Sequence, residues 1–369
     1  MVDLQSQYQK IKDTVDASIQ EVLNSSAYIN GPYVHEFQAD LEKYLGVKHV
    51  IPCANGTDAL QIAMMGLGLE PGDEVITADF TFAATVEVIG LLKLTPVLVD
   101  VEPDTFNIDI DALKKAITPK TKAIVPVHLF GQCANMEAVL EVANEHNLFV
   151  IEDNAQAIGA DYTFADGTKK KAGTMGNVGT TSFFPSKNLG CYGDGGAIFT
   201  NDDELAHILR GMVNHGMYKR YYHDVVGVNS RLDSIQAAVL KAKLPLLDSY
   251  CDARRKAAEY YSNAFADNPN IITPIISDFT THVFHQYTLR IINGKRDELH
   301  QHLLDKGIPN AIYYPVPLHA QKAYQDNRYN ETDFTVTNQL IDEVISLPMH
   351  TELDEEQLAF ITKTINDFI

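Results

Sequence analysis

The feature that most constrains the fold is an alternation of short apolar runs and helix-like patterns that starts near residue 48. Apolar strands that alternate with helices indicate a mainly parallel sheet with helices on both faces. We therefore predict an α/β fold in three layers, with helices, sheet and helices. The expected strands are 49–53, 73–78, 95–101, 121–130, 148–153, 180–185 and 195–201, and the expected helices are 57–69, 82–93, 109–117 and 135–146.

The C-terminal part of the chain has a different pattern. A long helical region is interrupted by Pro245, which cannot donate a backbone hydrogen bond. We place a domain boundary there, between a large domain of residues 1–245 and a smaller α/β domain of residues 246–369. A further helix at the N-terminus could pack against either domain. The elements expected outside the central alternation are helices 4–24, 231–265, 295–307 and 354–369 and a strand at 281–292.

Composition and charge exclude several classes of protein. The net charge of −20 argues against general nucleic-acid binding, which needs a basic face, although a small anionic ligand is still compatible with a locally positive pocket. We expect no membrane span, because no run of about 18 apolar residues occurs. The four cysteines and 13 histidines show no metal-ligand spacing, so we expect reduced thiols, a cytoplasmic location and no metal site.

Candidate site residues follow the expected strands, because ligands of open α/β sheets bind beyond the carboxyl ends of the strands. In "ANGTDAL", Gly56 and Thr57 come after a strand and open a helix, where backbone N–H groups and a hydroxyl suit a phosphate. The alternative is simple capping of this helix by Thr57 or Asp58.

Two further candidates are a carboxylate and an aromatic ring. Asp153 ends the run "FVIED", and a partly buried carboxylate needs a partner. That partner could be a protonated ring nitrogen of a ligand, or the residue could be a cap or a member of a salt bridge. Phe80 and Phe82 follow another strand, where either ring could stack on a planar ligand or simply pack in the core.

Lys187 lies in "SFFPSKNLGCYGDGGAI", between a Phe-rich run and several glycines. Apolar surroundings lower the pKa of a lysine and make its amine a usable nucleophile. The alternative is a solvated lysine in a loop. We expect the following glycines to allow positive φ angles and a close approach of the backbone to a ligand. These glycines are residues 190, 193, 195 and 196.

The combination of these groups is more specific than any one of them. A phosphate cradle, a strand-end carboxylate, a nucleophilic lysine and an aromatic plate are together what pyridoxal 5'-phosphate (PLP) requires. Lys187 would hold PLP as a Schiff base and, once displaced by a substrate amine, would move protons. A Rossmann-type dehydrogenase rests only on the α/β pattern, because no GxGxxG follows an N-terminal strand.

Over nearly its whole length the chain resembles nucleotide-sugar aminotransferases of the DegT/DnrJ/StrS family, which have the aspartate-aminotransferase fold (fold type I) of PLP enzymes. The resemblance rests on motifs such as "PGDEVIT", "VIEDNAQAIGA", "GVNSRLDSIQAAVL" and "YYPVPLHAQ". It implies that Lys187 forms the Schiff base, that Asp153 pairs with the pyridine nitrogen, that Phe82 stacks on the ring and that Gln156 lies near the ring's polar edge.

The resemblance also implies contacts to the phosphate and to the substrate. The phosphate would be held by Gly56, Thr57, Asp58 and Ser182. Asn229 would reach the phosphate across a homodimer interface, Arg231 would face the neighbouring active site, and Tyr314 would contact the substrate.

In activity, the resemblance implies transfer of an amino group from L-glutamate to a keto-sugar on a nucleotide, with 2-oxoglutarate as the second product. The motifs most resemble enzymes that act at C3 of UDP-2-acetamido-2-deoxy-3-oxo-glucuronate for surface polysaccharides such as lipopolysaccharide O-antigen. The competing substrate is a dTDP-3-oxo-6-deoxyhexose. Some relatives carry histidine in place of the lysine and perform a dehydration, so Lys187 favours transamination. A non-catalytic regulatory or binding protein on the same fold is the alternative of another class.

Overall fold

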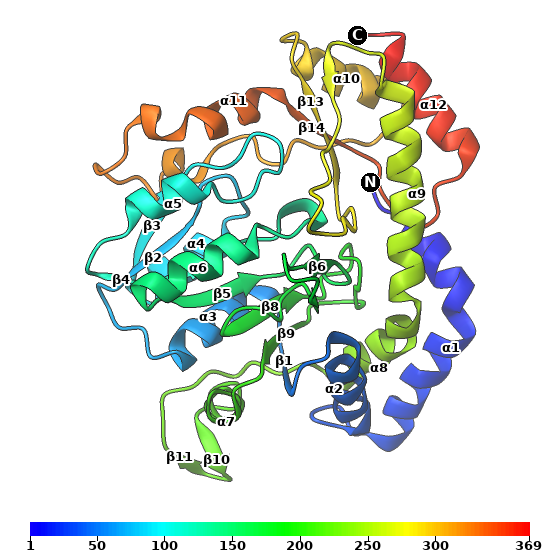
Figure 1. Ribbon diagram of the computed structural model, residues 1–369. Coiled ribbons are helices and arrows are strands. Elements are labelled where there is room, and N and C mark those ends of the chain that lie inside the picture. The colour runs from blue at the N-terminus through cyan, green and yellow to red at the C-terminus, as the bar shows by residue number, and fades with distance from the viewer.

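A seven-stranded sheet forms the centre of the computed structural model, which describes residues 1–369 (Figure 1). The strand order is β1-β9-β8-β5-β4-β2-β3, and β9 alone runs against the others. The predicted mainly parallel sheet is therefore confirmed. The strands are β1 (His49–Cys53), β2 (Glu74–Ala78), β3 (Thr95–Val99), β4 (Thr121–Val125), β5 (Phe149–Asp153), β8 (Val178–Ser182) and β9 (Gly196–Thr200).

Helices cover both faces of this sheet, each over its own apolar cluster. The larger cluster has 45 buried residues and the one on the opposite face has 21. The first face carries α2 (Pro32–Leu45), α5 (Ile110–Ala116), α6 (Met136–His146) and α8 (Ser234–Lys243), and the second carries α3 (Gly56–Gly66), α4 (Ala84–Leu91) and α7 (Asp203–Met212). The three-layer α/β/α architecture is confirmed.

The C-terminal part has a small antiparallel sheet and its own cluster of 18 buried residues, all between 257 and 365. Its elements are α9 (Leu247–Phe265), β12 (Ile271–Ile272), β13 (Tyr287–Ile291), α10 (Arg296–Asp305), α11 (Thr335–Glu343), β14 (Val344–Leu347) and α12 (Glu355–Asn366). Pro245 lies in the short 3₁₀ turn Leu244–Leu246 between α8 and α9, as predicted. The separate cluster supports a boundary at residue 245, which stays a proposal.

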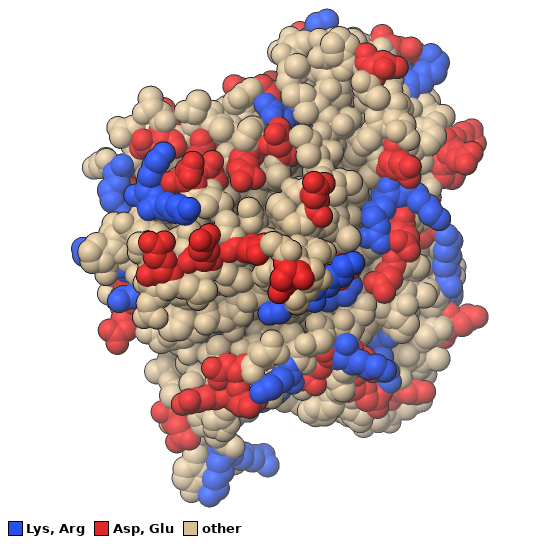
Figure 2. Space-filling model, viewed as in Figure 1, with Lys and Arg blue, Asp and Glu red and all other residues tan.

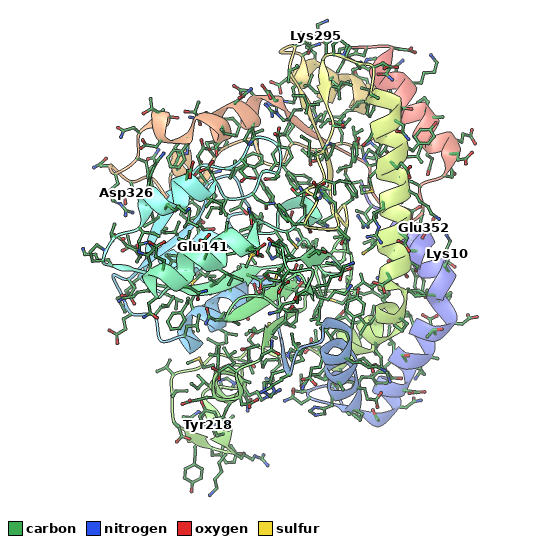
Figure 3. All side chains as sticks on the ribbon, in the orientation of Figure 1. Lys10, Glu141, Tyr218, Lys295, Asp326 and Glu352 are labelled. Atoms are coloured by element: carbon green, nitrogen blue, oxygen red, sulfur yellow. The ribbon has the colours of Figure 1, made fainter.

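The N-terminal helix α1 (Leu4–Ser25) touches both parts of the molecule. It packs against α8, and its Lys10 forms an ion pair with Glu352 of the C-terminal part (Figure 3). Helix α1 therefore contacts both the large domain and the C-terminal part, and does not pack against one of them alone.

Some elements differ from those expected. The strand expected at 281–292 is only 287–291, because residues before it form a loop in which Val283 N donates to Gly131 O. The strand expected at 121–130 ends before Pro126, which lacks a backbone N–H. Elements that the pattern did not predict include α2, α7, α11, β14 and two small hairpins, β6–β7 (Asp161–Thr163, Lys169–Lys171) and β10–β11 (Met217–Lys219, Tyr222–His223).

Two further observations concern the whole chain. None of the helices combines the length and the apolar character that crossing a membrane requires. No group of three or more His, Cys, Asp or Glu side chains is placed to hold a metal ion.

Candidate active site

A cavity of about 820 Å³ opens at the carboxyl ends of the central strands, where both parts of the chain meet. Nine of the predicted site residues line it, and they come from segments far apart in the sequence. They are Gly56, Thr57, Asp58, Phe82, Asp153, Gln156, Ser182, Lys187 and Tyr314. The other two, Asn229 and Arg231, are not in its wall.

The start of α3 forms the part of the cavity that suits a phosphate. The side chain of Asn55 accepts a hydrogen bond from Asp58 N at 2.8 Å, so the cap is Asn55 and the capping alternative for Thr57 or Asp58 is wrong. The N–H groups of Gly56 and Thr57 lie in the first turn of the helix, where no backbone carbonyl of the helix can accept from them. They lie at the positive end of the helix dipole. A backbone site of this kind fits an anion such as the phosphate of PLP.

Asp153 is the last residue of β5, and only 5% of it is exposed. Its two carboxylate oxygens accept hydrogen bonds from Thr85 Oγ1 at 2.8 Å and Ala155 N at 3.1 Å. No cationic side chain lies within ion-pair distance, so the salt-bridge alternative is wrong. A buried carboxylate without a cation is well placed to pair with a cationic group in the cavity, such as a protonated pyridine nitrogen.

Lys187 lies in the turn that follows β8, where its backbone N donates to Phe184 O at 2.8 Å. Desolvation in this turn lowers the pKa of the Lys187 amine to about 8, and the charge of Asp153 opposes that shift. An amine with this pKa is neutral in about a tenth of molecules at pH 7 and in about half at pH 8, far more than a solvated lysine. Its place in the cavity wall favours the reactive amine over an ordinary loop lysine.

The glycines after Lys187 have a different role from the one expected. None of residues 190, 193, 195 and 196 has a positive φ. A Cβ on Gly190 would lie 2.3 Å from Pro185 O, and a Cβ on Gly196 would lie 2.4 Å from the backbone carbonyl of Asn55. These glycines thus let protein segments pack closely and bring the start of α3 against the sheet.

The two aromatic candidates have different surroundings, one in the core and one at the cavity. Phe80 is 1% exposed and belongs to the core, whereas 58% of Phe82 is exposed at the cavity. The rings of Phe82 and Tyr314 lie 6.2 Å apart between centroids. Gln156 accepts from Phe130 N at 2.7 Å and donates from Nε2 to Tyr314 Oη at 3.2 Å, which fixes its orientation in the cavity wall.

His285 is a lining residue that sequence reasoning missed. It is 6% exposed, and burial together with the charges of Lys187 and Arg254 lowers its pKa well below the usual value, so the imidazole is neutral. His285 lies in the stretch expected to be a strand, and a strand pattern gives no sign that one residue faces a cavity in another part of the chain.

Asn229 and Arg231 lie beside the cavity without lining it. Between them, Ser230 Oγ accepts a hydrogen bond from Ala54 N at 3.0 Å, which fixes this segment next to the loop before α3. Asn229 is exposed, and Arg231 is half-buried and forms no ion pair.

The sequence pattern of the DegT/DnrJ/EryC1/StrS aminotransferase family matches residues 9–366. The chain belongs to this family. It is therefore an aminotransferase that uses PLP, and a solved structure from Bacillus subtilis that is 30% identical to it carries the amino form PMP. The cavity fits that cofactor because it contains the anion cradle, the unpaired buried carboxylate and the lysine with a lowered pKa. The alternative of a Rossmann-type dehydrogenase is wrong.

Similar proteins cover the full length of the chain. It is 46% identical to the UDP-2-acetamido-2-deoxy-3-oxo-D-glucuronate aminotransferase of Pseudomonas aeruginosa over 99% of both chains. It is 47% identical to a "pleiotropic regulatory protein" of Geobacillus stearothermophilus over 100% of this chain and 98% of that one. The Streptomyces venezuelae DesV structure in complex with a ketimine intermediate has a TM-score of 0.95 and 39% identity, with 100% and 97% of the two chains covered.

Proposed function

We propose that this protein transfers an amino group from L-glutamate to C3 of UDP-2-acetamido-2-deoxy-3-oxo-glucuronate, for the synthesis of a surface polysaccharide such as O-antigen. The observation that carries the reaction type is the meeting of Lys187, Asp153 and the start of α3 in one cavity. The choice of substrate is supported by the full-length similarity to the Pseudomonas aeruginosa enzyme.

Each residue of the cavity would have a definite task. Bound PLP supplies an electron sink for the carbon that exchanges its amino group. Lys187 Nζ would hold the cofactor and, when free, accept and return a proton, which its lowered pKa favours. Asp153 would keep the ring nitrogen protonated. The N–H groups of Gly56 and Thr57, with Ser182 and Asp58 beside them, would bind the phosphate, and Phe82 would cover the ring.

The proposal includes a cytoplasmic homodimer with shared active sites. The hairpin β10–β11 projects from the body of the protein, with Tyr218 on it (Figures 1 and 3). Tyr221 is 75% exposed and Val226 in the following loop is 83% exposed, which is unusual for apolar side chains unless a partner covers them. Figure 2 shows basic side chains at the tip of this hairpin.

Within such a dimer, Asn229 would reach the phosphate of the partner's cofactor. Arg231, which lacks an ion-pair partner in its own chain, would meet the uronate carboxylate, since guanidinium and carboxylate groups form paired hydrogen bonds. Tyr314 would contact the substrate from the same chain as Lys187.

The substrate is tested with a panel of UDP- and dTDP-linked 3-keto and 4-keto sugars, presented to the enzyme in its amino-cofactor form. We expect the UDP-linked 3-oxo-glucuronate to react fastest, and Lys187→Ala to react with none of them. Turnover of a dTDP-6-deoxy-ketosugar alone would contradict the uronate and leave the aminotransferase assignment intact.

A regulatory role is a second candidate, because the relative from Geobacillus stearothermophilus is named a regulatory protein. The glutamate half-reaction separates the two. We expect L-glutamate to abolish the visible absorbance of lysine-bound PLP as the amino form appears. A protein that binds PLP through Lys187 yet never reacts with glutamate would favour the regulatory role.

A further inference from the structure

A buried carboxylate–histidine pair joins the two segments that form the aromatic wall of the cavity. Asp79 directly follows β2, and His319 follows the segment that contains Tyr314. Asp79 Oδ1 accepts from His319 N at 2.7 Å, and Asp79 Oδ2 lies 2.7 Å from His319 Nδ1. Both oxygens of one carboxylate are thus bound to one residue that is 240 positions away in the chain.

Most of this pair is shielded from water. Asp79 is fully buried and His319 is 7% exposed. The imidazole stacks on Phe334 with 4.2 Å between ring centroids, and Phe334 belongs to a small apolar cluster with Val86 of α4. Charge-assisted hydrogen bonds in a dry environment are stronger and more directional than those at the surface. The pair can therefore hold the two segments in one relative position.

The segments that the pair joins carry the groups facing the cofactor. Phe82 lies in the loop between Asp79 and α4, and over half of its side chain is exposed. The ring of Tyr314 is its aromatic neighbour. Tyr314 in turn accepts the hydrogen bond from Gln156. An aromatic ring on an irregular loop needs a contact of this kind to hold it in the binding position before the cofactor binds.

We propose that Asp79 and His319 are positioning residues that set the aromatic wall, formed by Phe82 and Tyr314, for binding of PLP. They act through Phe82 and Tyr314 and line no part of the cavity themselves. This inference rests on the proposed binding of PLP in this cavity.

The test is the affinity of the apoprotein for PLP, measured by titration of the visible absorbance of lysine-bound PLP. The amide of Asp79→Asn cannot accept hydrogen bonds at both of its former oxygen positions. We expect this variant to raise the Kd for PLP about tenfold, which corresponds to about 1.4 kcal/mol. His319→Gln keeps the backbone hydrogen bond to Asp79 and should raise the Kd for PLP by a smaller factor. This variant replaces Asp79→Asn in the test if Asp79→Asn does not fold.

The chain offers two matched controls. Asp100 follows the neighbouring strand β3 and also accepts hydrogen bonds from the C-terminal segment, at Val336 N and Thr337 N, but it makes no hydrogen bond to Asp79, His319 or the aromatic wall. Glu331 faces the other ring nitrogen of His319 at 3.3 Å, and its side chain is 77% exposed. Asp100→Asn should lower the melting temperature. Glu331→Gln should change the melting temperature little, since ion pairs with an exposed partner contribute little to stability. Both variants should keep the Kd for PLP within about twofold of wild type.

A double-mutant cycle decides whether Asp79 acts through the wall. With Phe82→Leu present, Asp79→Asn should raise the Kd by a smaller factor than it does alone, because coupled sites are not additive. An unchanged Kd in Asp79→Asn, or equal factors with and without Phe82, would overturn the proposal. Failure of the wild-type protein to bind PLP would instead contradict the placement of the cofactor.

Discussion

At Lys187, burial and a nearby carboxylate act on the same amine in opposite directions. Desolvation removes the water that stabilises the ammonium form, and Asp153 restores part of that stabilisation by its charge. The outcome is a pKa of about 8, which leaves the amine ready to react and still able to carry a proton. A single lysine can therefore serve as nucleophile and as proton carrier.

The rate at which the apoprotein takes up PLP should follow the neutral fraction of Lys187. The protonated fraction falls as pH rises through the pKa, so the rate should increase up to about pH 8 and level off above it. A lysine with the ordinary value of 10.5 would give a rate that continues to rise. Stopped-flow absorbance measures the rate, and the same titration with a free lysine derivative supplies the pH dependence of PLP itself.

Asp153→Asn should move this profile to lower pH. The substitution removes the negative charge that raises the pKa of Lys187, so desolvation acts unopposed. Asp194→Asn is the matched control, because Asp194 lines the same cavity and does not perturb Lys187. A profile of Asp153→Asn that coincides with that of wild type would contradict the electrostatic coupling between the two residues.

Residues at strand ends were predictable from the sequence, and residues that depend on distant partners were not. Asp153 and Lys187 follow apolar strands, and strand ends meet at one edge of a parallel sheet. His285 and the pair of Asp79 with His319 come together only through packing of the C-terminal part on the sheet. No local pattern in the sequence encodes that contact.

Among the elements, the start of α3 shows how packing builds a binding site. Asn55 caps the helix, and two glycines let the helix start lie against the ends of β8 and β9. A Cβ on Gly56 would lie 2.7 Å from the Cβ of Ser182, and one on Gly196 would meet the carbonyl of Asn55. The proposed phosphate site therefore depends on close contact between elements that are distant in sequence.

Gly196→Ala should weaken this site. The new methyl group would lie 2.4 Å from backbone atoms that cannot turn aside, so the start of α3 has to move. We expect the free energy of unfolding to fall by about 1–3 kcal/mol, as is usual for overpacking. The Kd for PLP should rise as well, and denaturant unfolding with PLP titration measures both.

Gly193→Ala is the control for this prediction. Its Cβ would approach the side-chain amide of Gln236 at 2.9 Å, which is the flexible end of a side chain. We expect a smaller loss of stability and an unchanged affinity for PLP. Equal effects of the two substitutions on the affinity would show that the contact with Asn55 does not shape the phosphate site.

The central strands and helices were predictable because their apolar periods are long and regular, whereas the remaining elements lack such a signal. The strands of the hairpin β10–β11 are too short to show a regular apolar period, and most of its side chains are exposed. The loop before β13 reads as a strand because it is apolar, yet Phe284 adopts a φ of 45° there. Its conformation comes from contacts with residues 130–131 and not from its own preference.

At the scale of the whole molecule, the cavity contains the groups proposed to bind PLP but not every residue expected to act on it. Asn229 is exposed and Arg231 is half-buried, and both closely follow in sequence the hairpin segment with its exposed apolar side chains. Burying those side chains against a second copy would gain free energy from the hydrophobic effect. In a two-fold dimer the same contact is made twice, so both sites would be completed together.

Mixing two inactive variants tests this shared-site arrangement. Lys187→Ala removes the nucleophile from its own chain, and the double variant Asn229→Ala with Arg231→Ala removes the groups proposed to serve the partner's site. In a heterodimer, one site then lacks all three groups and the other is intact. Random exchange of subunits makes about half of the dimers mixed, so activity should recover to about a quarter of wild type. Sites completed within one chain would recover no activity on mixing, which size-exclusion chromatography and the glutamate half-reaction together would reveal.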